Sequence, residues 1–276
     1  MGTLGAAVSR IFWAFVVIVG LISTGFACAG AASAAEEQAL APTGKLRVAL
    51  LTGDATQAIR DAASSELKGV GFDLGKHLAQ RMGVPFEPVL YPSIGGLLDG
   101  GKAGAWDVAF IGLTPARAKE WDFTGPHLEV EFGYLVPAGS AITAIADVDR
   151  PGIRVVVQER SGPEAFISRN LKNAAVVPAP DYAAALEMQK SGKADVIFSI
   201  KPILFDLSRQ MPGSRVLDGS PGNVPQAMAL PKGRDPAITY ARKFIEEAKS
   251  GGLVKAAVER AGLRGVVIPN AQTPAH

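Results

Sequence analysis

Short apolar runs alternate with amphipathic segments through the first half of the chain, and this alternation limits the possible folds more than any other feature. Strands are expected at 46–51, 85–91 and 105–111, with a helix at 71–82 after the first strand and a short helix around Leu97 after the second. Such strand–helix alternation predicts a parallel sheet with helices packed on its faces. A further strand is expected at 132–136, where an apolar run ends at Pro137.

The same order of elements starts again in the second half. Strands are expected at 153–158, 175–178 and 194–199, separated by helices at 163–171 and 182–190. Short strands at 215–217 and 227–230 follow, and helices at 237–250 and 253–261 come last. Pro-Ala-Gly at 137–139 and Pro-Lys-Gly at 231–233 predict two chain crossings that form a hinge between two α/β lobes. Lobe 1 would comprise 44–136 and 231–266, lobe 2 would comprise 137–230, and 267–276 would be a disordered tail.

The first 35 residues predict a signal peptide. Arg10 is their only charged side chain, residues 11–26 are almost continuously apolar, and Ala-Ser-Ala at 32–34 matches a small-x-small cleavage site. A retained membrane anchor is the alternative. The single cysteine, Cys28, lies inside this segment, and Phe26 before it makes a poor lipid-attachment site. Cleavage would therefore leave a periplasmic protein without any thiol.

Charge and motif content argue against several classes of function. The net charge is +2, and no basic block is interleaved with aromatic residues, so nucleic acid is not an expected partner. His77, His127 and His276 are far apart and match no zinc-site spacing. The chain has neither a phosphate-cradling glycine loop nor a Gly-x-Ser-x-Gly motif, so no metal and no cofactor are expected.

Residues 112–123, which read GLTPARAKEWDF, contain the first candidate for a binding residue, Arg117. They follow an apolar run typical of a buried strand, and a Thr-Pro pair then opens a short basic helix. Such a turn presents backbone N–H groups, and here an arginine, to an anion at the end of a strand. The alternative is a surface ion pair between Arg117 and Glu120 or Asp122.

Four segments, in this order and spacing, resemble motifs of the extracellular solute-binding proteins of family 3, the polar-amino-acid type. They are LKGVGFDL at 67–74, GKAGAWDV at 101–108, LTPAR at 113–117 with DFTGP at 122–126, and SGKADV at 191–196. The resemblance extends from residue 46 to about residue 263. It implies a two-lobed periplasmic-binding-protein type II fold in which each lobe is a mainly parallel sheet flanked by helices. A fold does not by itself fix an activity.

The resemblance assigns a role to Arg117. In this family the corresponding arginine holds a ligand carboxylate between the lobes, a task that suits a planar guanidinium. Family members carry a hydroxyl residue five positions before that arginine, where this chain has Gly112, whose backbone can still donate. Thr114, within the same motif, is expected beside the ligand.

In the second lobe, the family's carboxylate-capping loop corresponds to residues 160–162. Ser161 is expected there as a helix N-cap or as a ligand donor, and Arg160 as a second cation or a solvated loop charge. The family's aspartate for the ligand amine falls on Ile200 in this chain. Either the ligand has no α-amino group, or another carboxylate such as Asp54 holds it, because a buried unpaired ammonium is costly.

Further candidates are less specific. The loop at 52–56 lacks an aromatic residue that could stack on a ligand, and Tyr91 or Phe198 could replace it or belong to the core. Ser199 and Lys201 flank Ile200 and are included in the expected site. A lysine next to Arg117 and Arg160 would favour an organic acid or an acidic amino acid.

Together these features predict capture of a small carboxylate-bearing solute by a monomeric protein that delivers it to an ABC permease with its ATPase subunit. Closure of the lobes about the two crossings would bury the ligand. Two alternatives remain. A periplasmic enzyme similar to cyclohexadienyl dehydratase would need an acid or base in the cleft, for which Glu159 and Asp54 are the candidates. A ligand-binding sensor would share the same sequence features.

Overall fold

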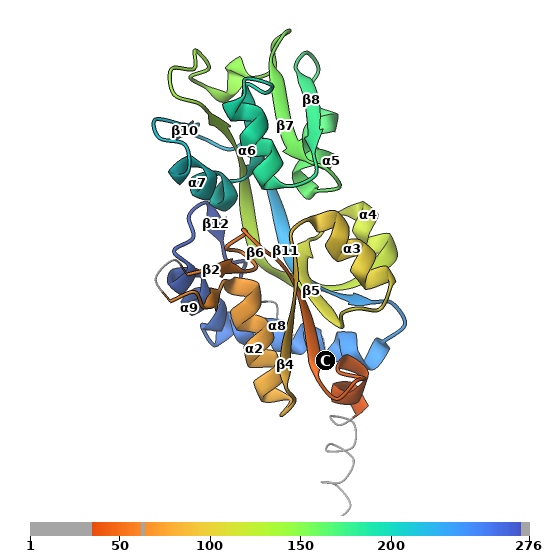
Figure 1. Cartoon of the computed structure of the whole chain (residues 1–276). Coiled ribbons are helices and arrows are strands. Elements are labelled where there is room, and N and C mark those ends of the chain that lie inside the picture. The colour runs from red at the N-terminus through yellow and green to blue at the C-terminus, as the bar shows by residue number, and fades with distance from the viewer. Residues whose placement is uncertain (1–34, 62–63, 272–276) are drawn as a thin grey trace, which may run out of the picture.

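The computed structural model of the chain describes residues 35–61 and 64–271, and it contains two α/β halves joined by two long strands (Figure 1). The predicted signal peptide, its cleavage site and Cys28 lie outside these residues, apart from Ala35. No helix in the described part is both long enough and apolar enough to cross a membrane.

Lobe 1 is built on three parallel strands, in the order β4-β1-β5. Its first elements are β1 (Leu46–Leu51), β2 (Ile59–Arg60), β3 (Leu67–Lys68), α2 (Val70–Arg81), β4 (Phe86–Tyr91), α3 (Ile94–Lys102), β5 (Val108–Gly112) and α4 (Pro115–Glu120). The chain returns to this lobe with α8 (Asp235–Ser250), α9 (Leu253–Ala261) and β12 (Val266–Val267). Every residue of β5 is buried, as expected for a parallel strand covered on both faces.

Lobe 2 repeats this plan with the parallel order β8-β7-β9. Its elements are η1 (Ile145–Asp147), β7 (Arg154–Gln158), α5 (Gly162–Asn170), β8 (Ala175–Ala179), α6 (Tyr182–Lys190), β9 (Val196–Ile200), α7 (Lys201–Arg209) and β10 (Arg215–Val216). An aromatic cluster of Phe132, Tyr134, Phe166 and Phe198 fills its core. Phe198 is fully buried there, so it is a core residue.

Two strands, β6 (Trp121–Val136) and β11 (Asn223–Pro231), connect the lobes and run between the upper and lower halves of Figure 1. The N-terminal part of β6 pairs with β11 in lobe 1, and Phe132 to Leu135 pair with β9 in lobe 2. The change of partner lies at Glu131 and Phe132, opposite Asn223 and Gly222. The prolines expected to mark the crossings, Pro137 and Pro231, instead lie at strand ends within lobe 2 and lobe 1.

Three other expectations differ from the structure. Strand β6 begins at Trp121 rather than at residue 132, because register shifts near Pro126 let the strand continue past Gly125-Pro126. Helix α7 was not predicted, and it starts directly after Ile200. The expected tail begins too early, because Val267 pairs with Glu129 in β12.

Candidate functional site

A small cavity lies between the lobes, where the carboxyl ends of the parallel strands face one another. Its walls include the last residues of β1, β5, β7 and β9, which are Leu51, Gly112, Gln158 and Ile200. Its free volume is about 40 Å³, so a solute larger than a few water molecules requires the lobes or side chains to move. A crevice beyond the carboxyl ends of such strands is where open α/β sheets bind ligands.

Arg117 reaches this cavity from the first turns of α4. Thr114 caps that helix, because its hydroxyl accepts a hydrogen bond from Arg117 N, and Pro115 fits the first helical position. The guanidinium is buried and donates to two carbonyl oxygens at 2.9 Å, Gly112 O from lobe 1 and Arg160 O from lobe 2. Burial lowers the pKa of Arg117 to about 10.

No carboxylate in residues 35–61 or 64–271 forms an ion pair with Arg117. The surface pair with Glu120 is absent, because Glu120 bonds Lys102 at 2.9 Å instead. A buried guanidinium held only by carbonyl dipoles retains N–H donors that can bind an anion. Gly112 lets the guanidinium approach, since a Cβ on that residue would lie 3.3 Å from Arg117 Nη1.

Asp54 is the only carboxylate among the cavity-lining residues, and it lies in the turn after β1. Gly53 enters this turn with φ at +79°, a conformation that glycine adopts readily. Thr56 donates to Asp54 Oδ1 from its backbone N–H at 2.8 Å and from its hydroxyl at 2.6 Å, while Oδ2 takes part in neither bond. Burial outweighs these bonds and raises the pKa of Asp54 to about 6.

The predicted loop of lobe 2 closes the other side of the cavity. Ser161 caps α5, since its hydroxyl accepts from Glu164 N at 3.0 Å and donates to Gln158 O at 2.6 Å. It also lines the cavity, so the predicted cap is present and its role as a ligand donor stays a prediction. Arg160 has φ at +58° and directs its guanidinium away, to a bidentate pair with Asp99 of lobe 1 at 2.8 and 2.9 Å.

Several predicted site residues do not line the cavity. The Lys201 ammonium pairs with Glu131, and the Tyr91 phenol packs against Gly100 of α3. Ser199 is buried in β9, where its hydroxyl lies close to the Tyr182 phenol without making a hydrogen bond of ordinary geometry. Glu159 is exposed and likewise outside the cavity. Across the described residues, no group of three or more His, Cys, Asp or Glu side chains could hold a metal ion.

Sequence reasoning missed four polar residues of the cavity wall. They are Gln57, Gln158, Gln226 and Tyr182. Burial, and then the nearby Asp54 carboxylate, raise the pKa of the Tyr182 phenol, so it remains a neutral hydrogen-bonding group. A glutamine at the end of a strand carries no charge pattern or spacing that marks it in a sequence. Only the position of Gln158 as the last residue of the strand predicted at 153–158 gave a usable signal.

The chain is similar in sequence and in fold to amino-acid-binding proteins of ABC transporters. It is 25% identical over 200 residues to the ABC transporter glutamine-binding protein GlnH of Bacillus subtilis. The aligned residues cover 70% of this chain and 72% of GlnH. Its fold matches an amino acid ABC transporter substrate-binding protein of Streptococcus pneumoniae bound to L-arginine, with a TM-score of 0.72, 22% identity, and coverage of 81% of this chain and 97% of that one.

A second solved structure is an ancestral amino acid-binding protein described as a precursor of cyclohexadienyl dehydratase. The TM-score is 0.70 at 24% identity, over 81% of this chain and 98% of that one. The sequence profile of the bacterial extracellular solute-binding proteins, family 3, matches residues 46–262. With the two-lobed fold and the interlobe cavity, this match establishes that the chain belongs to the bacterial extracellular solute-binding proteins of family 3.

Proposed function

We propose that this protein captures a small α-amino acid between its lobes and delivers it to an ABC importer. The observation that carries the proposal is the buried Arg117 guanidinium, which no carboxylate of the described chain neutralises. A buried charge without a counter-ion is unfavourable, and a ligand carboxylate would supply that counter-ion in a charge-assisted, bidentate contact.

The position of Asp54 supports a ligand that also carries an ammonium group. One cation and one carboxylate line the cavity, which complements the two charges of an α-amino acid. The other two cations that favoured an organic acid are already engaged, Lys201 by Glu131 and Arg160 by Asp99. Asp54 would thus replace the carboxylate that is missing at Ile200.

Ligand capture would proceed by closure of the lobes about β6 and β11. The bond from Arg117 Nη2 to Arg160 O joins the two lobes directly across the cavity. A ligand held by Arg117 and by the 160–162 loop would favour the closed arrangement through its contacts with both lobes. The closed protein, expected to be a monomer, would then be recognised by a permease with an ATPase subunit.

A thermal-shift screen of the purified protein against amino acids, dicarboxylates and aromatic acids tests the proposal. A ligand at about a hundredfold excess over its Kd should stabilise the protein by about 2.7 kcal/mol. Arg117→Met should abolish that shift while the protein stays folded. The matched control is Arg242→Met, because Arg242 also bonds only a backbone carbonyl but is exposed on α8. Retention of the full shift in Arg117→Met would exclude Arg117 as the carboxylate anchor.

An enzyme of the dehydratase type is the second candidate, and the buried Asp54 is the observation that favours it. A carboxyl group with a pKa of about 6 is suited to acid–base chemistry near neutral pH. The cavity offers no second carboxylate, and the phenol of Tyr182 would be the other proton-transfer group. Turnover of prephenate or arogenate that is lost in Asp54→Asn would favour this reading over transport.

A further inference from the structure

Gln158 places an amide with an unpaired oxygen in the wall of the cavity. It is the last residue of β7, is only 2% exposed, and its Nε2 reaches Pro180 O at the long distance of 3.5 Å. Its Oε1 is buried and has no hydrogen-bond partner among the described residues. An unpaired buried amide oxygen is costly, so a ligand group that donates to it would be strongly preferred over one that cannot.

Gln226 brings a second amide to the opposite wall. It pairs in register with Gly112 across the antiparallel strands β11 and β5, so both residues face the same side of the sheet. Because Gly112 has no side chain, the amide lies over it, with Nε2 3.7 Å from the point a Cβ would occupy. The Arg117 Nη1 atom is 3.3 Å from that same point, so the amide and the guanidinium flank one spot on the cavity wall.

The rest of the wall limits the side chain that a ligand can carry. Apart from Arg117 and Asp54, no charged residue lines the cavity, and Ile94, Ile200 and Val224 contribute apolar surface. A cationic or acidic ligand side chain would have no counter-ion beyond the two groups assigned to its carboxylate and ammonium.

We propose that Gln158 and Gln226 determine specificity by selecting an α-amino acid whose side chain ends in an uncharged hydrogen-bonding group. The proposal rests on the function proposed above, in which Arg117 and Asp54 hold the main-chain groups. Gln158 recognises the polar end of the side chain from lobe 2. Gln226 donates beside Arg117 from lobe 1, in the space left by Gly112.

Calorimetric titration with pairs of similarly shaped amino acids tests this selection. Threonine is compared with valine, serine with alanine, and asparagine with leucine, alongside lysine, arginine and glutamate. The polar member of at least one pair should bind about tenfold or more tightly than its alkyl partner, because the alkyl side chain leaves the amide unpaired. Equal or tighter binding of the alkyl member in every pair would overturn the proposal, as would a charged side chain as the best ligand.

Two variants then assign the preference to the glutamines. Gln158→Met and Gln226→Leu should each reduce the polar-to-alkyl affinity ratio several-fold, with little change for the alkyl ligand. The matched control is Gln189→Leu, because Gln189 Oε1 is also buried and unpaired but lies outside the cavity. That variant should keep the wild-type ratio, and a ratio that is unchanged in both cavity variants contradicts the assignment.

The polar-to-alkyl affinity ratio of the wild-type protein tests the proposal even if a glutamine variant does not fold. If Arg117→Met abolishes binding while the pairs bind equally, the amino-acid site stands and the side-chain selection fails. If Arg117→Met binds normally, the proposed function itself fails.

Discussion

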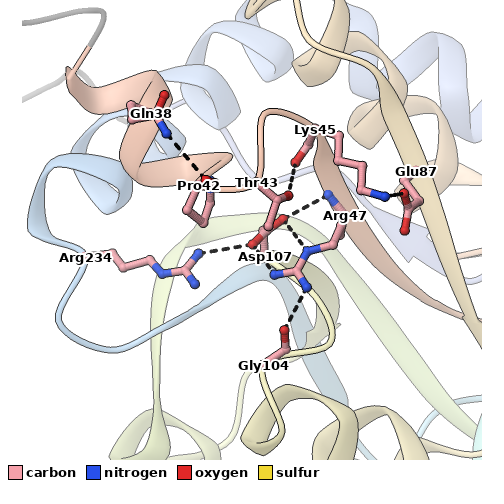
Figure 2. A network of polar contacts seen from close by, with 9 residues as sticks. All are labelled: Gln38, Pro42, Thr43, Lys45, Arg47, Glu87, Gly104, Asp107 and Arg234. Atoms are coloured by element: carbon pink, nitrogen blue, oxygen red, sulfur yellow. Dashed lines mark hydrogen bonds and ion pairs between the residues drawn. The ribbon is translucent and has the colours of Figure 1, made fainter.

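Each lobe contains the same arginine–aspartate clamp, but the two clamps differ in burial. Arg47 at the start of β1 bonds Asp107 through its backbone N at 3.1 Å, through Nε at 3.0 Å and through Nη2 at 2.7 Å (Figure 2). Arg154 at the start of β7 bonds Asp195 through the same three atoms at 2.8, 2.9 and 2.8 Å. In both lobes the aspartate directly precedes the third parallel strand, β5 or β9, and ties it to the central one, β1 or β7, which carries the arginine.

The surroundings of the clamps differ more than their geometry. The Asp107 side chain is 0% exposed and also receives Arg234 at 3.4 Å, whereas Asp195 is 32% exposed and its partner Arg154 is 41% exposed. Hydrogen bonding from Arg154 lowers the pKa of Asp195. Removing one partner of a buried pair leaves an uncompensated charge, while water compensates at an exposed pair. The same local pattern should therefore have unequal energetic weight in the two lobes.

The largest expected effect is a direct contrast between Asp107→Asn and Asp195→Asn. Asp107→Asn should lower the free energy of unfolding by about 3–5 kcal/mol, because Arg47 and Arg234 lose their shared counter-ion. Asp195→Asn should cost several times less. Urea unfolding followed by circular dichroism measures both, and similar losses would show that burial does not separate the two clamps.

A second effect is confined to lobe 1, which contains a fully buried histidine. His127 packs edge-on against Phe110, and neither ring nitrogen has a partner in the described part of the chain. Burial, assisted by the positive charge of Lys249, lowers the pKa of His127 to about 3. The folded state therefore stays unprotonated while the unfolded state takes up a proton, so stability falls as pH drops from about 6.5 toward 3. The slope is about 1.4 kcal/mol per pH unit.

The comparison of wild type with His127→Phe measures this contribution. Between about pH 6 and pH 3.8, the raised pKa of Asp54 makes the protein more stable as the pH falls. This effect is the same in wild type and variant, so it cancels in the comparison. The difference in unfolding free energy between them should shift in favour of the variant as the pH falls below 6.5. Parallel stability–pH curves would contradict a buried, unprotonated His127.

The two buried aspartates of lobe 1 also differ, since Asp107 is paired with arginines and Asp54 is not. If Asp54 holds the ligand ammonium, affinity should fall about tenfold between pH 7 and pH 5, as a group with a pKa of about 6 goes from mostly ionised to mostly protonated. Burial is the main cause of the raised pKa of Asp54, the Asp206 charge raises it further, and hydrogen bonds from Thr56 and Gln57 lower it. Titration at both pH values tests this, and Asp54→Asn should bind weakly with a flat profile. A pH-independent wild-type affinity would argue against Asp54 as the anchor.

The smallest effect on stability is expected at a third bidentate pair, Arg160–Asp99, which joins the lobes. Its side chains are 45% and 60% exposed, so water and salt screen it. Asp99→Asn should leave the urea midpoint unchanged and should speed ligand release only at low ionic strength. Stopped-flow measurements of the release rate at low and high salt test this prediction. If the pair had a structural role instead, the substitution would change the release rate equally at both salt concentrations.

Much of the fold was predictable because its inner parallel strands, β1, β5, β7 and β9, are almost completely buried. Such strands are apolar runs in the sequence, as at 48–51 and 108–111, and the helices between them have regular apolar spacing. Strand β6 was only partly predicted, because a strand was expected only at 132–136, while β11 accommodates Gly125 and Pro126 by a shift in register so that β6 begins at Trp121. Helix α7, which begins with Lys201-Pro202, was not predicted at all.

Within the site, four of the nine predicted residues line the cavity. They are Asp54, Gly112, Arg117 and Ser161. Each follows a strand or begins a helix, and such positions are visible in a sequence. Lys201 and Arg160, the two further cations considered for the ligand, do not line the cavity. Lys201 pairs with Glu131 and Arg160 with Asp99, and the positions of those two carboxylates in space cannot be read from the sequence.

By itself, the sequence determined the alternation of strands and helices, the duplicated lobes and an arginine at the end of a buried strand. These depend on residue type and spacing along the chain, which local propensity and burial translate into structure. Only the tertiary structure decided which charges neutralise one another and which amides face the cavity. Those outcomes depend on contacts between residues far apart in sequence, such as Arg117 with the carbonyl of Arg160, and no local pattern encodes them.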